Sequence, residues 1–426
     1  MFSMIIGEEI HQFIQELYPI SRSLTGNGVR ETLTRIATHI PLVVHEVPTG
    51  TQVLDWMVPK EWNIVDAYVK NERGERVIDF KKSNLHVVGY SVPVKETMTL
   101  AELRPHLFSL PEYPDSIPYR TSYYEESWGF CMRHNDLVKL PEGTYEVCID
   151  STLSDGNLTY GEYVIPGETK EEILISSHIC HPSLANDNLS GVALATYLAK
   201  AIQDTTPRYT YRFLFIPGTI GSITWLATHK DTVSNIKHGL VLTGIGDAGK
   251  MHYKKSRMGD TEIDRVVSHA LQHSGLGHTV LDFSPFGYDE RQYCSPGFNL
   301  SVGSLMRTPH GKYSEYHSSA DNLEFVSPKP LAEAYVLCQN VFSILEGNAS
   351  YANQIPFGEP QLGRRGLYET MGAASDVVKA RQLAMLWVLN FSDGNNSLLD
   401  IAERSGMEFS LIRQAADLLV KNSILV

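Results

Sequence analysis

The sequence predicts an α/β fold in which helices cover both faces of a mostly parallel sheet. An inserted all-β domain and a C-terminal helical module complete the chain. Three observations lead to this fold class. Apolar runs alternate with helical stretches at the start of the chain and again from about residue 156. Residues 51–149 instead carry short alternating runs separated by Pro, Gly and Asp turns. After Gly347 the chain loosens, and three short helical stretches follow.

The α/β domain is expected at residues 1–50 and 150–350, because its two parts share the same alternation of helices and strands. Its first helix, for example, places Ile10, Phe13, Ile14 and Leu17 on one face. The predicted helices are 8–18, 29–40, 192–199, 221–230, 261–274 and 328–345. The predicted strands are 42–47, 161–166, 173–177, 211–217, 239–243 and 298–303.

The insertion at residues 51–149 is predicted to be all-β. Its strands are expected at 63–69, 76–80, 85–90, 129–132 and 144–149. The stretch 105–124 contains four prolines and several tyrosines, which indicates a long ordered loop. Two interpretations of its aromatic residues stay open. They either pack over the small β domain or help to shape a substrate cleft.

The C-terminal module, residues 351–426, resembles a winged-helix or helix-turn-helix unit. Its helices are predicted at 377–390, 397–405 and 410–421, with Gly406 in the turn between the second and third helices. The basic and acidic residues of these helices balance, whereas a phosphate-binding face needs clustered Lys and Arg. We therefore expect protein contact or homo-oligomerisation through this module in preference to DNA binding.

Composition narrows the class of protein. The 426 residues are 42% hydrophobic and carry a net charge of −13 without a basic run, which gives no support for a nucleic-acid or membrane partner. The first nine residues lack the features of a secretory signal, and no apolar run approaches the roughly 20 residues that span a bilayer. The five cysteines are scattered and form no CxxC pair. They are typical of reduced thiols, so we expect a cytoplasmic protein.

The segment 176–191, SSHICHPSLANDNLSG, organises the chemistry. It follows a predicted buried strand and precedes a helix rich in small residues. Chemistry in open α/β sheets is found at this position. Histidine nitrogen and aspartate oxygen suit a divalent metal of the zinc type. Each residue alone also has a structural explanation, because Asp-Asn before a helix is often only an N-cap.

Three further loops after strands carry ionisable residues. The first contains Asp247, the second spans 286–293 and the third spans 313–322. If the strands are parallel, all these loops meet the segment 176–191 at one edge of the sheet. The sequence therefore predicts several imidazoles and carboxylates around one point, as a metal hydrolase requires.

The segments HPSLANDNLSGVA and EYHSSADN resemble the ligand segments of the dinuclear-zinc aminopeptidases, the aminopeptidase Y and bacterial leucyl aminopeptidase group. Over nearly its full length, the chain resembles a bacterial family of aminopeptidase-like proteins. That family combines a peptidase fold, an inserted β domain and a C-terminal winged helix. The resemblance implies a three-layer sheet of the zinc-peptidase type.

Carried over by position, His178 matches the first histidine ligand, Asp187 the bridging aspartate and His317 the last histidine ligand. Other positions differ from the aminopeptidases. Cys180 stands where an aspartate orients the first histidine. The glutamate pair, a general base and a ligand, is missing from 217–222. A further aspartate ligand falls near Thr243, with Asp247 as the nearest substitute.

We therefore predict a metal-dependent hydrolase of amide bonds that uses a metal-bound water and one or two zinc ions. The predicted metal residues are His178, Asp187, His317 and Asp247. The predicted catalytic residues are Glu290, as general base, and Asp289; either Asp289 or Glu315 could bind a substrate ammonium. Glu315 is the second choice of base. His181 could bind the metal or only cap the loop, and the capping role is the one expected.

The substrate is expected to be a peptide or another amide. Two alternatives stay open. A catalytically altered metal-binding or metal-free scaffold would bind a peptide or sugar ligand through its β domain. A transcription regulator would use the winged helix.

Overall fold

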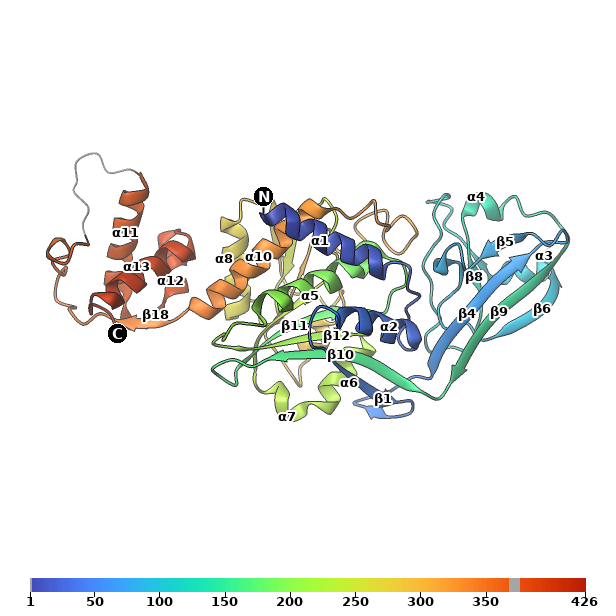
Figure 1. The fold of residues 1–426 in the computed structure, drawn as a ribbon, viewed down its shortest axis with the longest axis horizontal. Helices are drawn as coiled ribbons and strands as arrows, with labels where there is room; N and C mark the ends of the chain where they lie inside the picture. Colours follow the sequence, from blue (N-terminus) through green and yellow to red (C-terminus); the bar gives the residue numbers. More distant parts are fainter. Residues whose placement is uncertain (1, 368–375) are drawn as a thin grey trace. The chain divides into compact units, whose positions relative to one another are not determined.

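The computed structural model describes residues 2–367 and 376–426, and the chain divides into two compact units (Figure 1). The first unit comprises Met1–Asp264 and Gly277–Val336, and the second comprises Arg265–Leu276 and Leu337–Val426.

The main sheet of the first unit has eight strands among the described residues, in the order β1-β10-β12-β11-β13-β16-β14-β15. Strands β12, β11, β13 and β16 run parallel to one another, so their carboxyl ends meet at one edge. The pairings of β10 with β12 and of β14 with β16 are antiparallel, which makes the sheet mixed. The strands are β1 (Val43–Pro48), β10 (Asn157–Ile165), β11 (Glu172–His178), β12 (Thr210–Ile216), β13 (Ile236–Leu242), β14 (Met251–Lys254), β15 (His278–Leu281) and β16 (Val302–Met306).

Helices cover the sheet on both faces, with α1 and α5 on one face and α6 on the other (Figure 1). Helix α5 is the most buried of these, because its first nine residues are all buried. Its start needs Gly191, since a Cβ there would overlap the carbonyl oxygen of Leu242 on β13. The helices are α1 (Phe2–Leu17), α2 (Asn27–Ile36), α5 (Gly191–Ile202), α6 (Ile220–Thr228), α7 (Lys230–Val233), α8 (Glu262–His273), α9 (Glu290–Tyr293) and α10 (Pro328–Gly347).

The insertion forms a separate antiparallel sheet in the order β5-β4-β9-β6. Burial alternates along β9, where Tyr145, Val147 and Ile149 point into the core of this sheet. The strands are β4 (Glu61–Lys70), β5 (Arg76–Asp79), β6 (Val94–Thr99) and β9 (Thr144–Ser154). Shorter elements are β2 (Gln52–Val53), β3 (Trp56–Met57), α3 (Leu100–Leu103), β7 (Leu107–Phe108), β8 (Phe130–Cys131) and α4 (His134–Leu137).

The second unit includes parts of α8 and α10, and its described residues after Gly347 form the helices α11, α12 and α13 and a two-stranded sheet, as predicted for a winged-helix module. These elements are β17 (Ser350–Ala352), α11 (Asp376–Phe391), β18 (Asp393–Ser397), α12 (Leu398–Ser405) and α13 (Phe409–Lys421). Helix α12 begins at a capping box of Ser397 and Asp400 and ends at Gly406, whose φ is +66°. The predicted range 351–426 includes residues 368–375, which lie outside the described residues.

The predicted fold class is confirmed, and several details differ. The strand expected at 85–90 is replaced by a short 3-10 helix at Asn84–His86 and isolated bridges, and strand β6 was not predicted. The strand expected at 298–303 is β16 at Val302–Met306, because residues 295–299 form a turn in which Asn299 has a φ of +49°. The helix expected at 221–230 divides into α6 and α7. Strands β14 and β15 were not predicted, since each has only four residues and includes polar side chains.

No helix among the described residues is long and apolar enough to cross a membrane.

A buried ion-pair network joins three adjacent strands of the main sheet. The Nε of Arg212 on β12 donates to Glu172 on β11 at 2.6 Å, and its Nη1 donates to Glu162 on β10 at 2.6 Å. All three side chains are buried. Removing one partner of such a network leaves uncompensated charge inside the protein.

We expect Arg212→Ala to lower the free energy of unfolding by about 3–5 kcal/mol. The matched control is Arg35→Ala, because Arg35 lies on the surface of α2 and only approaches Glu31, at 3.9 Å. An exposed pair of this kind contributes less than about 0.5 kcal/mol. Chemical denaturation of the two variants checks the difference, and similar losses of stability would contradict the prediction.

Candidate metal centre

The loop between β11 and α5 begins with His178, the last residue of β11, and contains Asp187 in a wide turn at Ala185–Ser190. Asn188 holds this turn against the sheet. Its Nδ2 donates to Ser177 Oγ at 2.9 Å, and its Oδ1 accepts the backbone N–H of Gly244 at 3.1 Å. The peptide bond between Asp187 and Asn188 is cis. The hydrogen bonds of Asn188 fix the end of β11 relative to the start of α5.

The carboxylate of Asp187 lies between two imidazoles. His178 Nε2 is 3.0 Å from Oδ1, and His317 Nε2 is 3.1 Å from Oδ2. Asp187 and His178 are buried, whereas the side chain of His317 is 35% exposed. Burial opposes ionisation of Asp187, but the neighbouring imidazoles outweigh it and hold the pKa of the carboxyl well below its usual range. The carboxylate is therefore charged and has an imidazole at each oxygen.

A second aspartate, Asp321, holds the backbone of the turn that carries Asp187. The backbone N–H groups of Asn186 and Asp187 donate to the two oxygens of Asp321 at 2.6 and 2.9 Å. Burial raises the pKa of Asp321 to about 8, although both N–H bonds oppose the shift. Asp321 follows His317 by four residues, so one short segment positions both a predicted ligand and the turn that carries Asp187.

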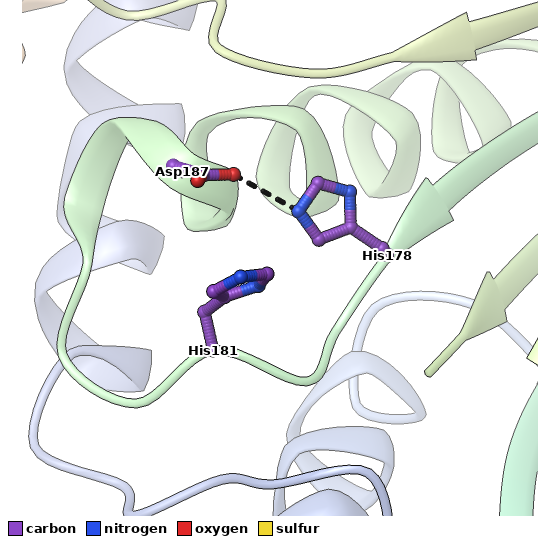
Figure 2. Close-up of side chains that lie close together, drawn as sticks. All are labelled: His178, His181 and Asp187. Atoms are coloured by element: carbon purple, nitrogen blue, oxygen red, sulfur yellow. Dashed lines mark hydrogen bonds and ion pairs between the residues drawn. The ribbon is translucent and has the colours of Figure 1, made fainter. Parts of the chain in front are cut away.

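His181 is the third imidazole at this point. His178, His181 and Asp187 each offer a ligand atom, and these atoms all lie within 4.8 Å of one another. Figure 2 shows His178 at the end of its strand, Asp187 on the turn and His181 in the loop between them. Burial lowers the pKa of His181 well below its usual value, which favours the neutral imidazole that binds metals. His181 was expected only to cap the loop, but its imidazole lies close enough to His178 and Asp187 to share a metal ion with them.

Cys180 does not offer a thiolate to this group. Its Sγ is 3.3 Å from the hydroxyl of Tyr288 and accepts the N–H of Gly218 at 3.3 Å. Burial raises the pKa of the Cys180 thiol to about 12. The residue therefore acts as a small buried group that connects the loop to β12.

Asp289 lies beside residues 217–222, the segment where the resemblance leads us to expect a glutamate pair. Its Oδ1 accepts the N–H of Thr219 at 2.7 Å and the hydroxyl of Ser222 at 2.8 Å, at the beginning of α6. Its Oδ2 is buried and has no hydrogen-bond partner among the described residues. Burial raises the pKa of Asp289 to about 6. One oxygen is thus anchored and the other is free.

Glu290 is held by a structural partner. Its carboxylate forms a buried ion pair with Lys254 of β14 and accepts the N–H of Tyr288. Lys254 also donates to the carbonyl oxygens of Ser284 and Phe286, so the pair supports the loop before α9. These contacts occupy Glu290, and they do not favour the predicted role of general base.

Asp247 is buried in a hydrogen-bond network apart from the group of three. Its oxygens accept Asn186 Nδ2 at 3.0 Å and the hydroxyl of Thr308 at 2.7 Å. The structure therefore does not bring Asp247 into the cluster of His178, His181 and Asp187. Its role as a metal residue stays a prediction.

The insertion contacts the segment that carries His317. The N–H of Tyr119 donates to the carbonyl oxygen of His317 at 2.8 Å, and Ser319 exchanges two hydrogen bonds with Ile117. The ring of Tyr119 also lies 5.2 Å from that of His317. His317 has a φ of +53°, a strained conformation that these contacts stabilise. Tyr119 therefore belongs to the surroundings of the site and does not only pack over the β domain.

Two protein families together match residues 11–426 of the chain. The family described as a domain of unknown function (DUF4910) matches residues 11–348. The chain belongs to the DUF4910 family. A winged helix-turn-helix family matches residues 349–426.

A protein of Clostridium acetobutylicum is 56% identical to this DUF4910 chain over 419 residues, which cover 98% of this chain and 96% of the relative. Its provisional name is polysaccharide biosynthesis protein with aminopeptidase-like domain. A crystal structure from Clostridium acetobutylicum, provisionally described as a peptidase, is 54% identical and has a TM-score of 0.95. It matches 100% of this chain over 97% of its own length.

A zinc aminopeptidase from Bacillus subtilis has a TM-score of 0.57 at 11% identity and covers 80% of this chain and 94% of its own. This likeness concerns the fold alone. The predicted aminopeptidase fold and C-terminal winged helix are confirmed for this DUF4910 chain.

Sequence reasoning missed two side chains near the site. The ring of Tyr288 lies 4.0 Å from that of His178. His310 is half-buried, and its buried Nε2 has no hydrogen-bond partner among the described residues. Burial lowers the pKa of His310. Its place in the loop after β16 was a usable signal, because the site lies at the carboxyl ends of the strands.

We expect Lys254→Met to lower the free energy of unfolding by about 3–5 kcal/mol, because it leaves the buried Glu290 without its cation. The double variant Lys254→Met/Glu290→Gln removes the charge and should recover at least half of that loss. Lys255→Met is the matched control, since Lys255 only approaches the exposed Asp282 at 3.6 Å. Chemical denaturation measures all three, and an unchanged stability of Lys254→Met would contradict a structural role of this pair.

Proposed function

We propose that this protein is a metal-dependent hydrolase of amide bonds with an aminopeptidase-like reaction. The observation that carries the proposal is the buried Asp187 carboxylate with an imidazole at each of its oxygens. A charged carboxylate and neutral imidazoles are the donor set that zinc prefers in catalytic sites.

The residues present fit a metal ion of this kind. His178 and Asp187 would hold it, and His317 faces the second oxygen of Asp187. The donors are buried, and two nearby groups, Asp289 Oδ2 and His310 Nε2, have no partner among the described residues. A bound divalent ion would supply Lewis acidity toward an amide carbonyl and toward water.

Asp289 is the residue proposed to move protons. Its free Oδ2 can accept a proton from the attacking water and return it to the leaving amine. The hydrogen bonds from Thr219 and Ser222 to Oδ1 restrict rotation of the carboxylate, so Oδ2 keeps one orientation. The free oxygen favours Asp289 over Glu290, which is paired with Lys254.

Glu315 is proposed to bind the ammonium of an amino-terminal substrate. It is two residues before His317 and partly exposed, and Ser314 Oγ donates to its Oε2 at 2.9 Å. A carboxylate at this place can meet a cationic group of the substrate from the solvent side.

A binding scaffold without catalysis is the second candidate. The absence of a glutamate from residues 217–222 favours it, because that segment carries the usual base in the aminopeptidases. Such a protein would bind a peptide or a sugar ligand. The name of the Clostridium acetobutylicum relative, which refers to polysaccharide biosynthesis, agrees with the sugar ligand.

The two candidates differ in turnover. We expect the zinc-loaded full chain to hydrolyse members of a panel of aminoacyl anilides, peptides and N-acylated sugars. Asp289→Asn should lower kcat by about 10²–10⁴ because it removes the proton acceptor, with an unchanged metal content. Asp187→Asn should lose both metal and turnover. Release of the amine and elemental mass spectrometry provide the two measurements.

Asp282→Asn is the control for the loss of one carboxylate, since the side chain of Asp282 is 95% exposed and only approaches Lys255, at 3.6 Å. Its kcat should equal that of the unmodified chain. A zinc-loaded protein that turns over none of these substrates would overturn the hydrolase proposal and favour the scaffold. An Asp289→Asn variant with full kcat would exclude Asp289 as the base.

A further inference from the structure

We infer that the site holds one divalent metal ion, bound by His178, His181 and Asp187, rather than the two ions of the dinuclear aminopeptidases. The inference rests on the proposed function, because it concerns the metal of the same site. It adds His181 as a ligand and assigns His317 to the orientation of Asp187.

Three side chains form a complete donor set for one ion. His178, His181 and Asp187 are buried, and their ligand atoms lie within 4.8 Å of one another. Two imidazoles and one carboxylate, with a fourth position left open, are a common ligand set of catalytic zinc. No movement of the backbone is needed to bring these side chains together (Figure 2).

His181 is held firmly enough to act as a ligand. The guanidinium of Arg22 is buried, and its Nε donates to the carbonyl oxygen of His181 at 2.9 Å. The imidazole Nδ1 lies 3.5 Å from Cys180 Sγ, and the ring of Tyr119 packs at 5.0 Å. These contacts restrict the orientation of the ring. Such outer contacts orient metal-bound histidines.

At Oδ2 of Asp187 the nearest donor is His317, at 3.1 Å, and the centroid of its ring lies 5.3 Å from that of His181. In the described part of the chain, no other group of three histidine, cysteine or carboxylate donors lies within 4.8 Å. A side chain at Gly218 is excluded, because a Cβ there would overlap the ring of Tyr288. Asp289 belongs to no such group, and its Oδ1 is anchored at the beginning of α6. With His181 bound to the first ion, a second ion would therefore lack a third ligand.

The strand beside the site, β13, also lacks a ligand that the resemblance leads us to expect. Thr243, directly after β13, stands where the resemblance places an aspartate ligand, and its buried hydroxyl has no partner among the described residues. A neutral hydroxyl is a weaker zinc ligand than a carboxylate or an imidazole. His181, within the loop itself, provides the donor that this strand lacks.

His317 then has a positioning role. Its Nε2 lies 3.1 Å from Asp187 Oδ2, the oxygen that faces away from His178. This contact leaves Oδ1, the oxygen beside His178, available to the metal. Loss of an outer contact of this kind lowers metal affinity by about 10–100-fold without removing the site.

The test is the metal stoichiometry of the full chain. The protein is incubated with excess zinc, dialysed and measured by elemental mass spectrometry. In parallel, the metal-free protein is titrated with Co²⁺, and the visible absorption is followed. We expect both to end at about one equivalent. His181→Asn should reduce the bound zinc at least about tenfold and abolish the Co²⁺ absorption, whereas His317→Gln should keep about one equivalent with weaker binding.

His278→Gln is the matched control, because His278 is an exposed histidine on β15. Circular dichroism of each variant shows whether it is folded. Two equivalents in the unmodified chain would overturn the single-ion inference and leave the proposed function intact. One equivalent retained by a folded His181→Asn variant would exclude His181 as a ligand. No binding of Zn²⁺ or Co²⁺ by the unmodified chain would overturn both proposals together.

Discussion

The buried carboxylate of Asp187 imposes the constraint that the surrounding structure has to meet. A charged group removed from water is costly unless other groups donate to it. His178 and His317 approach its two oxygens, and the backbone N–H of Asp187 is itself bound by Asp321. These partners belong to the end of β11 and to the loop after β16, so both must be fixed for the carboxylate to stay charged.

The same constraint explains why the insertion contacts the α/β part at this place. His317 reaches Asp187 with a positive φ, a conformation that costs about 1–3 kcal/mol for a residue other than glycine. The hydrogen bond from Tyr119 and the exchange between Ser319 and Ile117 hold the segment in that conformation. The β domain is thus part of the structure that positions a histidine of the site.

Much of this arrangement could be predicted from the sequence, because its signals are local. The apolar run before His178 and the small residues after Asp187 predict a strand, a loop and a closely packed helix. Contacts between distant residues were not predictable. Lys254 and Glu290 are 36 positions apart, and nothing in either segment shows that they pair. The short strands β14 and β15 lack an apolar run, so the strand that carries Lys254 was itself missed.

The missing glutamate pair illustrates how tertiary structure replaces a local motif. Residues 217–222 carry no acidic side chain, and from the sequence this absence suggests an incomplete site. In the structure, Tyr288 fills the space beside Gly218, and Asp289 binds Thr219 and Ser222 at the start of α6. A carboxylate therefore stands at this position although it comes from another loop. Since one of its oxygens is anchored and the other is free, Asp289 has the property that a proton acceptor needs, which is a fixed direction without a competing partner.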